Sequence, residues 1–261
     1  MNNIKLIKKL RHSTGLGIMT CKKALNKYKG NIQLAINYLL TIHRLKSNVN
    51  FPKEGIIKIK VSHNLVLMLE INCETDFVSN DINFIRFVNK VANKSLYTNQ
   101  TNIKTLVNDK LELDRKILIK KLNENIIVRK LILININKYI NNTIGCYNHK
   151  NRICSLVLLT NCNLQIANDI AMHIIATNPN VIYIKDFTNE EIKKEKSYIL
   201  SNIKKGIKPI TIINKIIKTK FKKYFNENSL FNQYFIKDTK RTIYHYLSNN
   251  STIISFFRLE I

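Results

Sequence analysis

The amino-acid sequence predicts an α+β protein in which a small N-terminal helical bundle precedes a larger core of helices and strands. Apolar residues recur at helical spacing over residues 1–45, whereas short runs of alternating apolar and polar residues begin at Gly55. The succession strand, strand, helices, strand then occurs twice, which suggests two related α+β subdomains with antiparallel sheets. We expect these subdomains to occupy residues 55–137 and 138–261.

The first part of the chain, residues 1–45, predicts three short helices that pack as a bundle. Apolar side chains mark one face of each helix, and glycines mark the turns between them. Asn31 is expected to be the N-cap of the third helix, because its side chain can accept a hydrogen bond from a free backbone N–H. The polar segment 46–54 contains Pro52 and predicts a linker to the core.

The core shows separate strand and helix patterns. Strands are predicted at residues 57–61, 65–71, 126–136, 152–160 and 252–261, and helices at 82–92, 109–122 and 166–175. Residues from about 189 to 225 predict an antiparallel helical hairpin that opens with Asn189 as its N-cap and breaks at 206–209. This hairpin is too thin to hold a core of its own and is rich in lysine. A solvated arm and a docking arm are both consistent with it.

The charge of the chain is strongly positive. There are 43 Lys and Arg against 17 Asp and Glu, a net charge of +26. A basic protein can bind RNA by neutralising phosphates, so an RNA-binding or ribosome-associated protein is one hypothesis. However, Lys, Asn and Ile have AT-rich codons and are abundant, whereas Gly, Pro and Trp are scarce, so genome base bias accounts for much of the charge. Arg, the better bidentate phosphate ligand, is sparse. We expect nucleic-acid binding to be non-specific at most.

Compartment and targeting follow from what the sequence lacks. No run approaches the roughly 18–20 consecutive apolar residues that a membrane span needs, and the N-terminus lacks the apolar core of a signal peptide. Five cysteines, an odd number without paired spacing, favour a reducing compartment. We expect a protein of the cytoplasm of a bacterium with an AT-rich, reduced genome, with an organelle as the alternative, and no contact with membranes.

A search for catalytic or metal-binding patterns finds little. Cys146, Cys154 and Cys162 are spaced too widely for paired zinc ligands, and there is no phosphate-binding glycine loop. A hydrolase or transferase using Cys21 or Cys73 is disfavoured because both lie in apolar patterns, where a thiolate is suppressed. The sequence therefore predicts no cofactor, no metal and no catalysis of covalent bonds.

One acidic and aromatic segment is unusual in this basic chain. Residues 71–81 join a predicted buried strand to a helix and contain Asp76, Phe77 and Asp81. In a structural interpretation, Asp81 caps the following helix and Phe77 packs into the core as a hydrophobic staple. In a functional interpretation, the acid and the aromatic ring protrude as a wedge toward a partner. The residues alone leave both open.

Several segments, in order along the chain, resemble the translation elongation factor Ts family. They are residues 10–25 (LRHSTGLGIMTCKKAL), 72–78 (NCETDFV), 145–153 (GCYNHKNRI) and 170–179 (IAMHIIATNP). Members of this family are guanine-nucleotide exchange factors for elongation factor Tu and support translation elongation. The resemblance implies a partner in its GDP-bound and nucleotide-free states, in a 1:1 or 2:2 complex.

The resemblance also implies roles for individual segments and residues. Residues 1–45 would form a ubiquitin-associated-type domain, and the lysine-rich hairpin would be a coiled-coil arm. Asp76 and Phe77 would form a tip inserted near the nucleotide site. The stretch associated with displacing Mg²⁺ is Phe77, Val78, Ser79 and Asn80, and the further partner contacts are Ile18, Met19, Lys22 and His149.

This sequence departs from the family pattern at several places. Asn123 stands where members usually carry Gly, and Lys150 and Asn151 follow His149 where small residues are usual. Asn tolerates a left-handed backbone, so we expect the change at Asn123 to be mild. We expect Lys150 to alter the contact around His149. The chain also ends before the C-terminal helix that many members carry, which predicts reduced affinity or an adapted partner.

Overall fold

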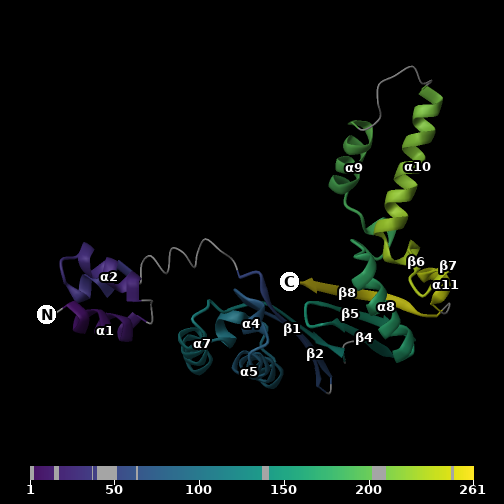
Figure 1. Ribbon diagram of the computed structural model, residues 1–261. Coiled ribbons are helices and arrows are strands. Elements are labelled where there is room, and N and C mark those ends of the chain that lie inside the picture. Colours follow the sequence, from purple (N-terminus) through teal and green to yellow (C-terminus); the bar gives the residue numbers. More distant parts are fainter. Residues whose placement is uncertain are drawn as a thin grey trace. The chain divides into compact units, whose positions relative to one another are not determined.

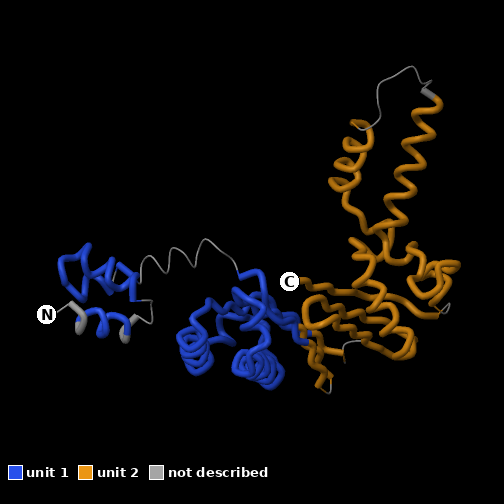
Figure 2. The backbone as a smooth tube through the Cα atoms, viewed as in Figure 1, with its two compact units in different colours: residues 1–58, 69–133, 261 blue, residues 59–68, 134–260 orange. Residues whose placement is uncertain are grey.

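The computed structural model describes residues 3–14, 18–36, 38–39, 52–62, 64–136, 141–201, 210–247 and 250–261. The chain divides into two compact units (Figure 2). The first comprises residues 1–58, 69–133 and 261, and the second comprises residues 59–68 and 134–260. The domain boundaries predicted from the sequence remain predictions. The fold class is confirmed at the level of a mixed helix and strand protein with small antiparallel sheets.

The N-terminal bundle contains α1 (Asn3–Thr14), α2 (Ile18–Lys27) and further helical residues at 32–36 and 38–39. Its core consists of Leu10, Cys21, Ala24, Leu25, Ala35 and Leu39. The backbone N–H of Leu34 donates to Asn31 Oδ1 at 3.1 Å, which confirms Asn31 as a helix cap. The predicted glycine turn at 15–17 and residues 46–51 of the predicted linker lie outside the described residues.

A three-stranded sheet follows, with the order β1-β2-β3. Its strands are β1 (Glu54–Ser62), β2 (Leu65–Cys73) and β3 (Ile127–Asn135). Between β2 and β3 come α4 (Asp76–Ser79), α5 (Ile82–Thr98), α6 (Ile103–Leu106) and α7 (Asp109–Leu122) (Figure 1). The predicted strands at 57–61, 65–71 and 126–136 and the helices at 82–92 and 109–122 are confirmed. The amphipathic pattern of α5 continues past the predicted end to Thr98.

Asparagine ends helices in this glycine-poor chain. Asn99, Asn123 and Asn178 close α5, α7 and α8 (Leu164–Thr177) with φ of 52°, 56° and 45°. A left-handed residue at this position lets its N–H reach back to an unpaired helix carbonyl. The N–H of Asn123 donates to the carbonyl of Ile119 at 2.8 Å. The expectation that Asn123 tolerates a left-handed backbone is therefore confirmed.

The second unit contains an antiparallel sheet of order β4-β5-β8, formed by β4 (Asn142–His149), β5 (Ile153–Thr160) and β8 (Thr252–Glu260). The helix α8, which confirms the helix predicted at 166–175, packs on this sheet. The backbones approach closely at Gly145, where a Cβ atom would lie 2.0 Å from the carbonyl oxygen of Ala167. Only glycine fits there without moving the helix.

Two longer helices and a small hairpin complete the second unit (Figure 1). The helices are α9 (Asn189–Ser201) and α10 (Ile210–Asn228), and the short helix η2 (Ile184–Asp186) precedes them. After them come η3 (Leu230–Asn232), the hairpin strands β6 (Tyr234–Phe235) and β7 (Asp238–Thr242), and α11 (Ile243–Tyr246). The predicted N-cap at Asn189 is wrong. Thr188 is the cap, because it accepts from Glu191 N at 3.3 Å while Glu191 accepts from Thr188 N at 2.8 Å.

The predicted break at 206–209 lies outside the described residues. In the part of the chain that the structure describes, no helix has the length and apolar character to cross a membrane.

Candidate partner-binding site

The acidic and aromatic segment forms a tip between β2 and α5. The chain leaves β2 at Cys73, makes the single turn of α4 and enters α5 after Asp81. The side chain of Phe77 is 83% exposed, and Asp76 and Asn80 are also exposed. The structural interpretation, in which Phe77 packs into the core, is therefore wrong, because α4 turns the ring outward. Asp81 does cap α5, as that interpretation predicted.

The exposure of Phe77 does not result from a loose segment. The next two side chains along α4, Val78 and Ser79, are each only 7% exposed. One helical turn thus anchors two residues in the protein and directs Asp76 and Phe77 to solvent. Burying a Phe side chain is worth about 1.5–3 kcal/mol, so this exposed ring leaves apolar surface available to a partner.

A carboxylate from a distant loop fixes the start of the tip. Glu124, which follows α7, accepts three hydrogen bonds, from Glu74 N at 3.1 Å, Thr75 N at 3.0 Å and Thr75 Oγ1 at 2.5 Å. In return, Glu74 Oε1 accepts from Asn125 N at 3.0 Å. Hydrogen bonds to a charged acceptor are stronger than neutral ones. The tip is therefore held by a reciprocal pair of acidic residues that we call the Glu74–Glu124 clamp.

Local hydrogen bonds fix the remainder of the tip. Ser79 Oγ and Asn80 Nδ2 both donate to the carbonyl of Asp76, at 2.8 and 2.9 Å. Asp81 accepts from Asn83 Nδ2 at 3.0 Å and from the backbone N–H of Asn83 at 2.7 Å. The side-chain hydrogen bond from Asn83, followed by that backbone bond, lowers the pKa of Asp81. Asp81 is accordingly ionised at neutral pH, as a helix cap should be.

A second predicted contact surface lies on α2. Ile18 and Met19 are 53% and 64% exposed, and Lys22 is exposed one turn further along the same face. Cys21, Ala24 and Leu25 of the same helix are buried in the core of the bundle. The sequence-predicted residues Ile18, Met19 and Lys22 thus share one solvent-facing surface.

The third predicted contact, His149, is exposed at the end of β4 in the second unit. The next two residues, Lys150 and Asn151, have left-handed φ of 52° and 59°, and Arg152 N donates to the His149 carbonyl at 3.0 Å. Two consecutive positive φ values are typical of tight hairpin turns that favour Gly and Asn. This geometry favours Gly or Asn after His149 and makes Lys150 an unfavourable residue there.

Comparison with known proteins decides the family. Residues 74–261 match the family model described as Elongation factor TS. The chain belongs to the elongation factor Ts family. Among curated relatives, Elongation factor Ts of Vesicomyosocius okutanii subsp. Calyptogena okutanii is 39% identical over 98% of this chain and 91% of its own length. That of Saccharophagus degradans is 36% identical over 98% and 90%, and that of Marinobacter nauticus is 37% identical over 98% and 89%.

Membership of the elongation factor Ts family implies guanine-nucleotide exchange on elongation factor Tu during translation elongation, and no covalent chemistry. The cysteines are consistent with this. Burial raises the pKa of Cys146 to about 11 and that of Cys154 to about 12, so both remain thiols at neutral pH. Cys21 and Cys73 are buried, and Cys73 Sγ donates to the Thr75 carbonyl at 3.2 Å. Within the described residues, no three or more His, Cys, Asp or Glu side chains come together as metal ligands.

The sequence analysis missed the Glu74–Glu124 clamp. Its two acids are 50 residues apart and belong to loops without periodicity, so no spacing rule connects them. The available signal was indirect. In a chain with few acids, Glu74 and Glu124 each lie at the border of a predicted helix and strand, where a carboxylate can accept from free backbone N–H groups.

Proposed function

We propose that this chain promotes release of GDP from elongation factor Tu by inserting the Asp76–Phe77 tip near the nucleotide and displacing Mg²⁺. The observation that carries the proposal is the 83% exposed Phe77 ring on an otherwise anchored turn. Family membership supplies the partner and the nucleotide class. The tip supplies a rigid apolar group next to an exposed carboxylate, Asp76.

The energetics of such a mechanism are simple. Mg²⁺ bridges the nucleotide phosphates and the GTPase, so moving it removes charge neutralisation that holds GDP. Burying the Phe77 ring in the partner is worth about 1.5–3 kcal/mol, or roughly 10- to 100-fold in an equilibrium. Coupling between two ligands is reciprocal, so a tip that weakens GDP binding is itself bound more weakly when GDP is present. No covalent step is required.

Pre-organisation makes the tip effective. A flexible loop would lose conformational entropy on insertion, and that loss would subtract from the binding energy. Here the Glu74–Glu124 clamp and the Asp81 cap restrict the tip before any partner is present. We therefore assign Glu124 the role of a positioning residue, which does not itself touch the partner or its nucleotide.

The other predicted surfaces complete the proposed interaction. We assign the N-terminal bundle a ubiquitin-associated-type architecture, docking through Ile18, Met19 and Lys22, and we assign His149 a second contact in the other unit. The helices α9 and α10 lie side by side (Figure 1) and would serve as the coiled-coil arm. The chain would bind GDP-bound and nucleotide-free elongation factor Tu, as a 1:1 or 2:2 complex. Because the relatives named above are bacterial, we place this activity in a bacterial cytoplasm.

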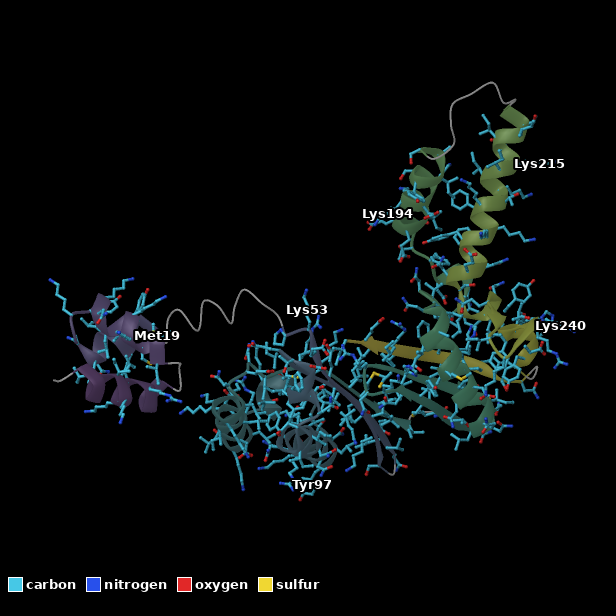
Figure 3. The ribbon with its side chains drawn as sticks, viewed as in Figure 1. Met19, Lys53, Tyr97, Lys194, Lys215 and Lys240 are labelled. Atoms are coloured by element: carbon cyan, nitrogen blue, oxygen red, sulfur yellow. The ribbon has the colours of Figure 1, made fainter. Side chains whose placement is uncertain are left out.

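The test is release of a fluorescent GDP from the cognate elongation factor Tu. We expect the wild-type chain to accelerate release and Phe77→Ala to lose about 10- to 100-fold of that acceleration. Tyr97→Ala is the matched control, because Tyr97 is also an exposed aromatic residue, at 92%, but lies near the end of α5 (Figure 3). Folding of each variant is checked by circular dichroism. Unchanged release with Phe77→Ala would refute the inserted tip, and no acceleration by the wild type would refute exchange.

A further inference from the structure

A row of aromatic rings crosses the second unit at the base of α10. Tyr183 contacts Phe231 with ring centroids 4.9 Å apart, Phe231 contacts Tyr244 at 5.3 Å, and Tyr244 contacts His245 at 5.0 Å. These residues come from three segments, the approach to η2, the helix η3 and the helix α11. We call Tyr183, Phe231, Tyr244 and His245 the aromatic strip.

The aromatic strip is a surface feature and not part of the core. Tyr244 is 57% exposed, His245 is exposed, and Tyr183 and Phe231 are half-buried. A neighbouring pair shows the contrast, since Phe235 stacks on Tyr246 at 4.1 Å and is only 2% exposed. Rings that only filled the core would be covered as Phe235 is. The strip instead keeps aromatic surface in solvent.

One cation contacts the aromatic strip, and further cations lie in the elements that adjoin it along the chain. The ammonium of Lys185 lies 5.1 Å from the Tyr183 ring centroid. Lys240 and Arg241 are exposed in β7, which leads directly into α11 (Figure 3). The helix α10, which ends just before η3, carries the exposed lysines Lys215, Lys218, Lys220, Lys222 and Lys223. From residue 183 to residue 247 there are fifteen Lys or Arg and six Asp or Glu.

The lysines of α10 are arranged in a way that suits a linear polyanion. Lys215, Lys218 and Lys222 follow the spacing i, i+3, i+7 and therefore share one face of the helix. Ile213 and Tyr224, on the opposite side of the helix, are half-buried. The basic face of α10 thus leads toward the aromatic strip at the end of the helix.

We propose that the aromatic strip and the cations around it form a binding site for single-stranded nucleic acid. Every base has a ring face that can stack on an exposed aromatic side chain, while lysines neutralise the phosphates. A duplex would present only phosphates, because its base faces are already stacked. Genome base bias changes how often Lys, Tyr and Phe occur, but it does not bring rings from three segments into contact. Neither interaction involves the 2′-hydroxyl, so RNA and DNA strands should bind alike.

The site is tested with the full-length chain by fluorescence anisotropy at physiological salt. The probes are a short labelled oligouridylate, the matching oligodeoxythymidylate, a blunt RNA duplex of equal length, and inorganic polyphosphate as competitor. We expect both single strands to bind more tightly than the duplex, and polyphosphate to compete poorly per unit charge. Tyr244→Ala should weaken binding about 5- to 100-fold, which corresponds to about 1–3 kcal/mol per stacked base. Tyr97→Ala is the exposed-aromatic control and should bind as the wild type does.

A second pair of variants separates charge from stacking. Lys185→Gln and Lys240→Gln should each reduce the slope of log affinity against log salt by about 0.7, without changing the preference for single strands over the duplex. Unchanged affinity with Tyr244→Ala would overturn the proposal, as would equal competition by polyphosphate. Tight binding of poly-glutamate in place of oligonucleotides would also overturn it and indicate an acidic protein partner. Tyr244→Ala should still accelerate GDP release from elongation factor Tu as the wild type does. The nucleic-acid site and the Asp76–Phe77 tip are therefore tested independently of each other.

Discussion

The Asp76–Phe77 tip and the turn after His149 present exposed residues in the same local setting but are held by different forces. Each follows a strand at its end, and each directs a side chain to solvent. The tip depends on long-range hydrogen bonds, since Glu124 lies about 50 residues away in the chain. The His149 turn depends on local features, since Lys150 and Asn151 are both left-handed and the Asn148 side chain accepts from Asn151 N at 2.7 Å and donates to Asn151 Oδ1 at 2.9 Å.

This difference affects which sequence changes each region tolerates. A turn fixed by its own dihedral angles is sensitive to the residue type at those positions, because left-handed backbone disfavours side chains other than Asn, Asp and Gly. A turn fixed by a distant carboxylate is sensitive to that carboxylate and tolerates more at its own positions. Exchange activity should therefore depend on Glu124 more than on any residue of the His149 turn.

Of the changes that distinguish the tip from the His149 turn, Glu124→Ala is expected to have the largest effect on exchange activity. The change removes three hydrogen bonds to a charged acceptor and should cost about 2 kcal/mol of stability. It also frees the tip, so the acceleration of GDP release should fall by a factor of about 5–30. Release of fluorescent GDP and urea unfolding are the two measurements.

Glu124→Gln is the matched control for this change. Its amide oxygen can still accept from a tip N–H, but the charge is lost and the second oxygen is replaced by a donor. We expect its exchange defect to fall between that of the wild type and that of Glu124→Ala. If Glu124→Ala unfolds at a lower urea concentration yet accelerates GDP release from elongation factor Tu as the wild type does, the clamp stabilises the unit without positioning the tip.

Much of the fold could be predicted from local pattern. Alternation identified β1 and helical spacing identified α5, α7 and α8, because each of these elements has one apolar face. Continuous apolar runs identified β2 and β5, which are buried along nearly their whole length. Asp81 and Asn31 were recognised as caps because a helix start needs a short polar side chain. The prediction of Asn189 as a cap was wrong, since Thr188 also suits the position and its reciprocal hydrogen bonds with Glu191 make it the cap.

The site was less predictable because its determinants are tertiary. Whether Phe77 pointed inward or outward depended on how one turn of helix sits over the buried Val78 and Ser79. Local spacing allowed either orientation. The Glu74–Glu124 clamp and the aromatic strip each join loops or short helices that are far apart in the chain. A periodic pattern in the sequence cannot predict such contacts.

A smaller effect is expected from His149→Ala. His149 is exposed and belongs to a turn that holds itself without the imidazole, so the variant should fold as the wild type does. Most interface residues contribute less than 1 kcal/mol, so the affinity for elongation factor Tu should fall by less than about 5-fold. Isothermal titration with nucleotide-free elongation factor Tu measures this change. A loss as large as that of Phe77→Ala would remove the distinction between a main tip and a secondary contact.

The smallest effect on exchange, and the only gain in stability, is expected from Lys150→Gly. Lys150 has φ of 52°, a conformation that costs a non-glycine residue about 1–2 kcal/mol, and the greater freedom of Gly in the unfolded chain offsets part of that gain. The net result should be about 1 kcal/mol of added stability in urea unfolding, with GDP release unchanged. Asn151→Gly is the control and should gain no stability, because Asn already tolerates the left-handed region at φ of 59° and the change removes the hydrogen bond from Asn148 Nδ2 to Asn151 Oδ1. If GDP release from elongation factor Tu is instead slower with Lys150→Gly, the lysine side chain contacts the partner, and that contact offsets the strain of its left-handed backbone.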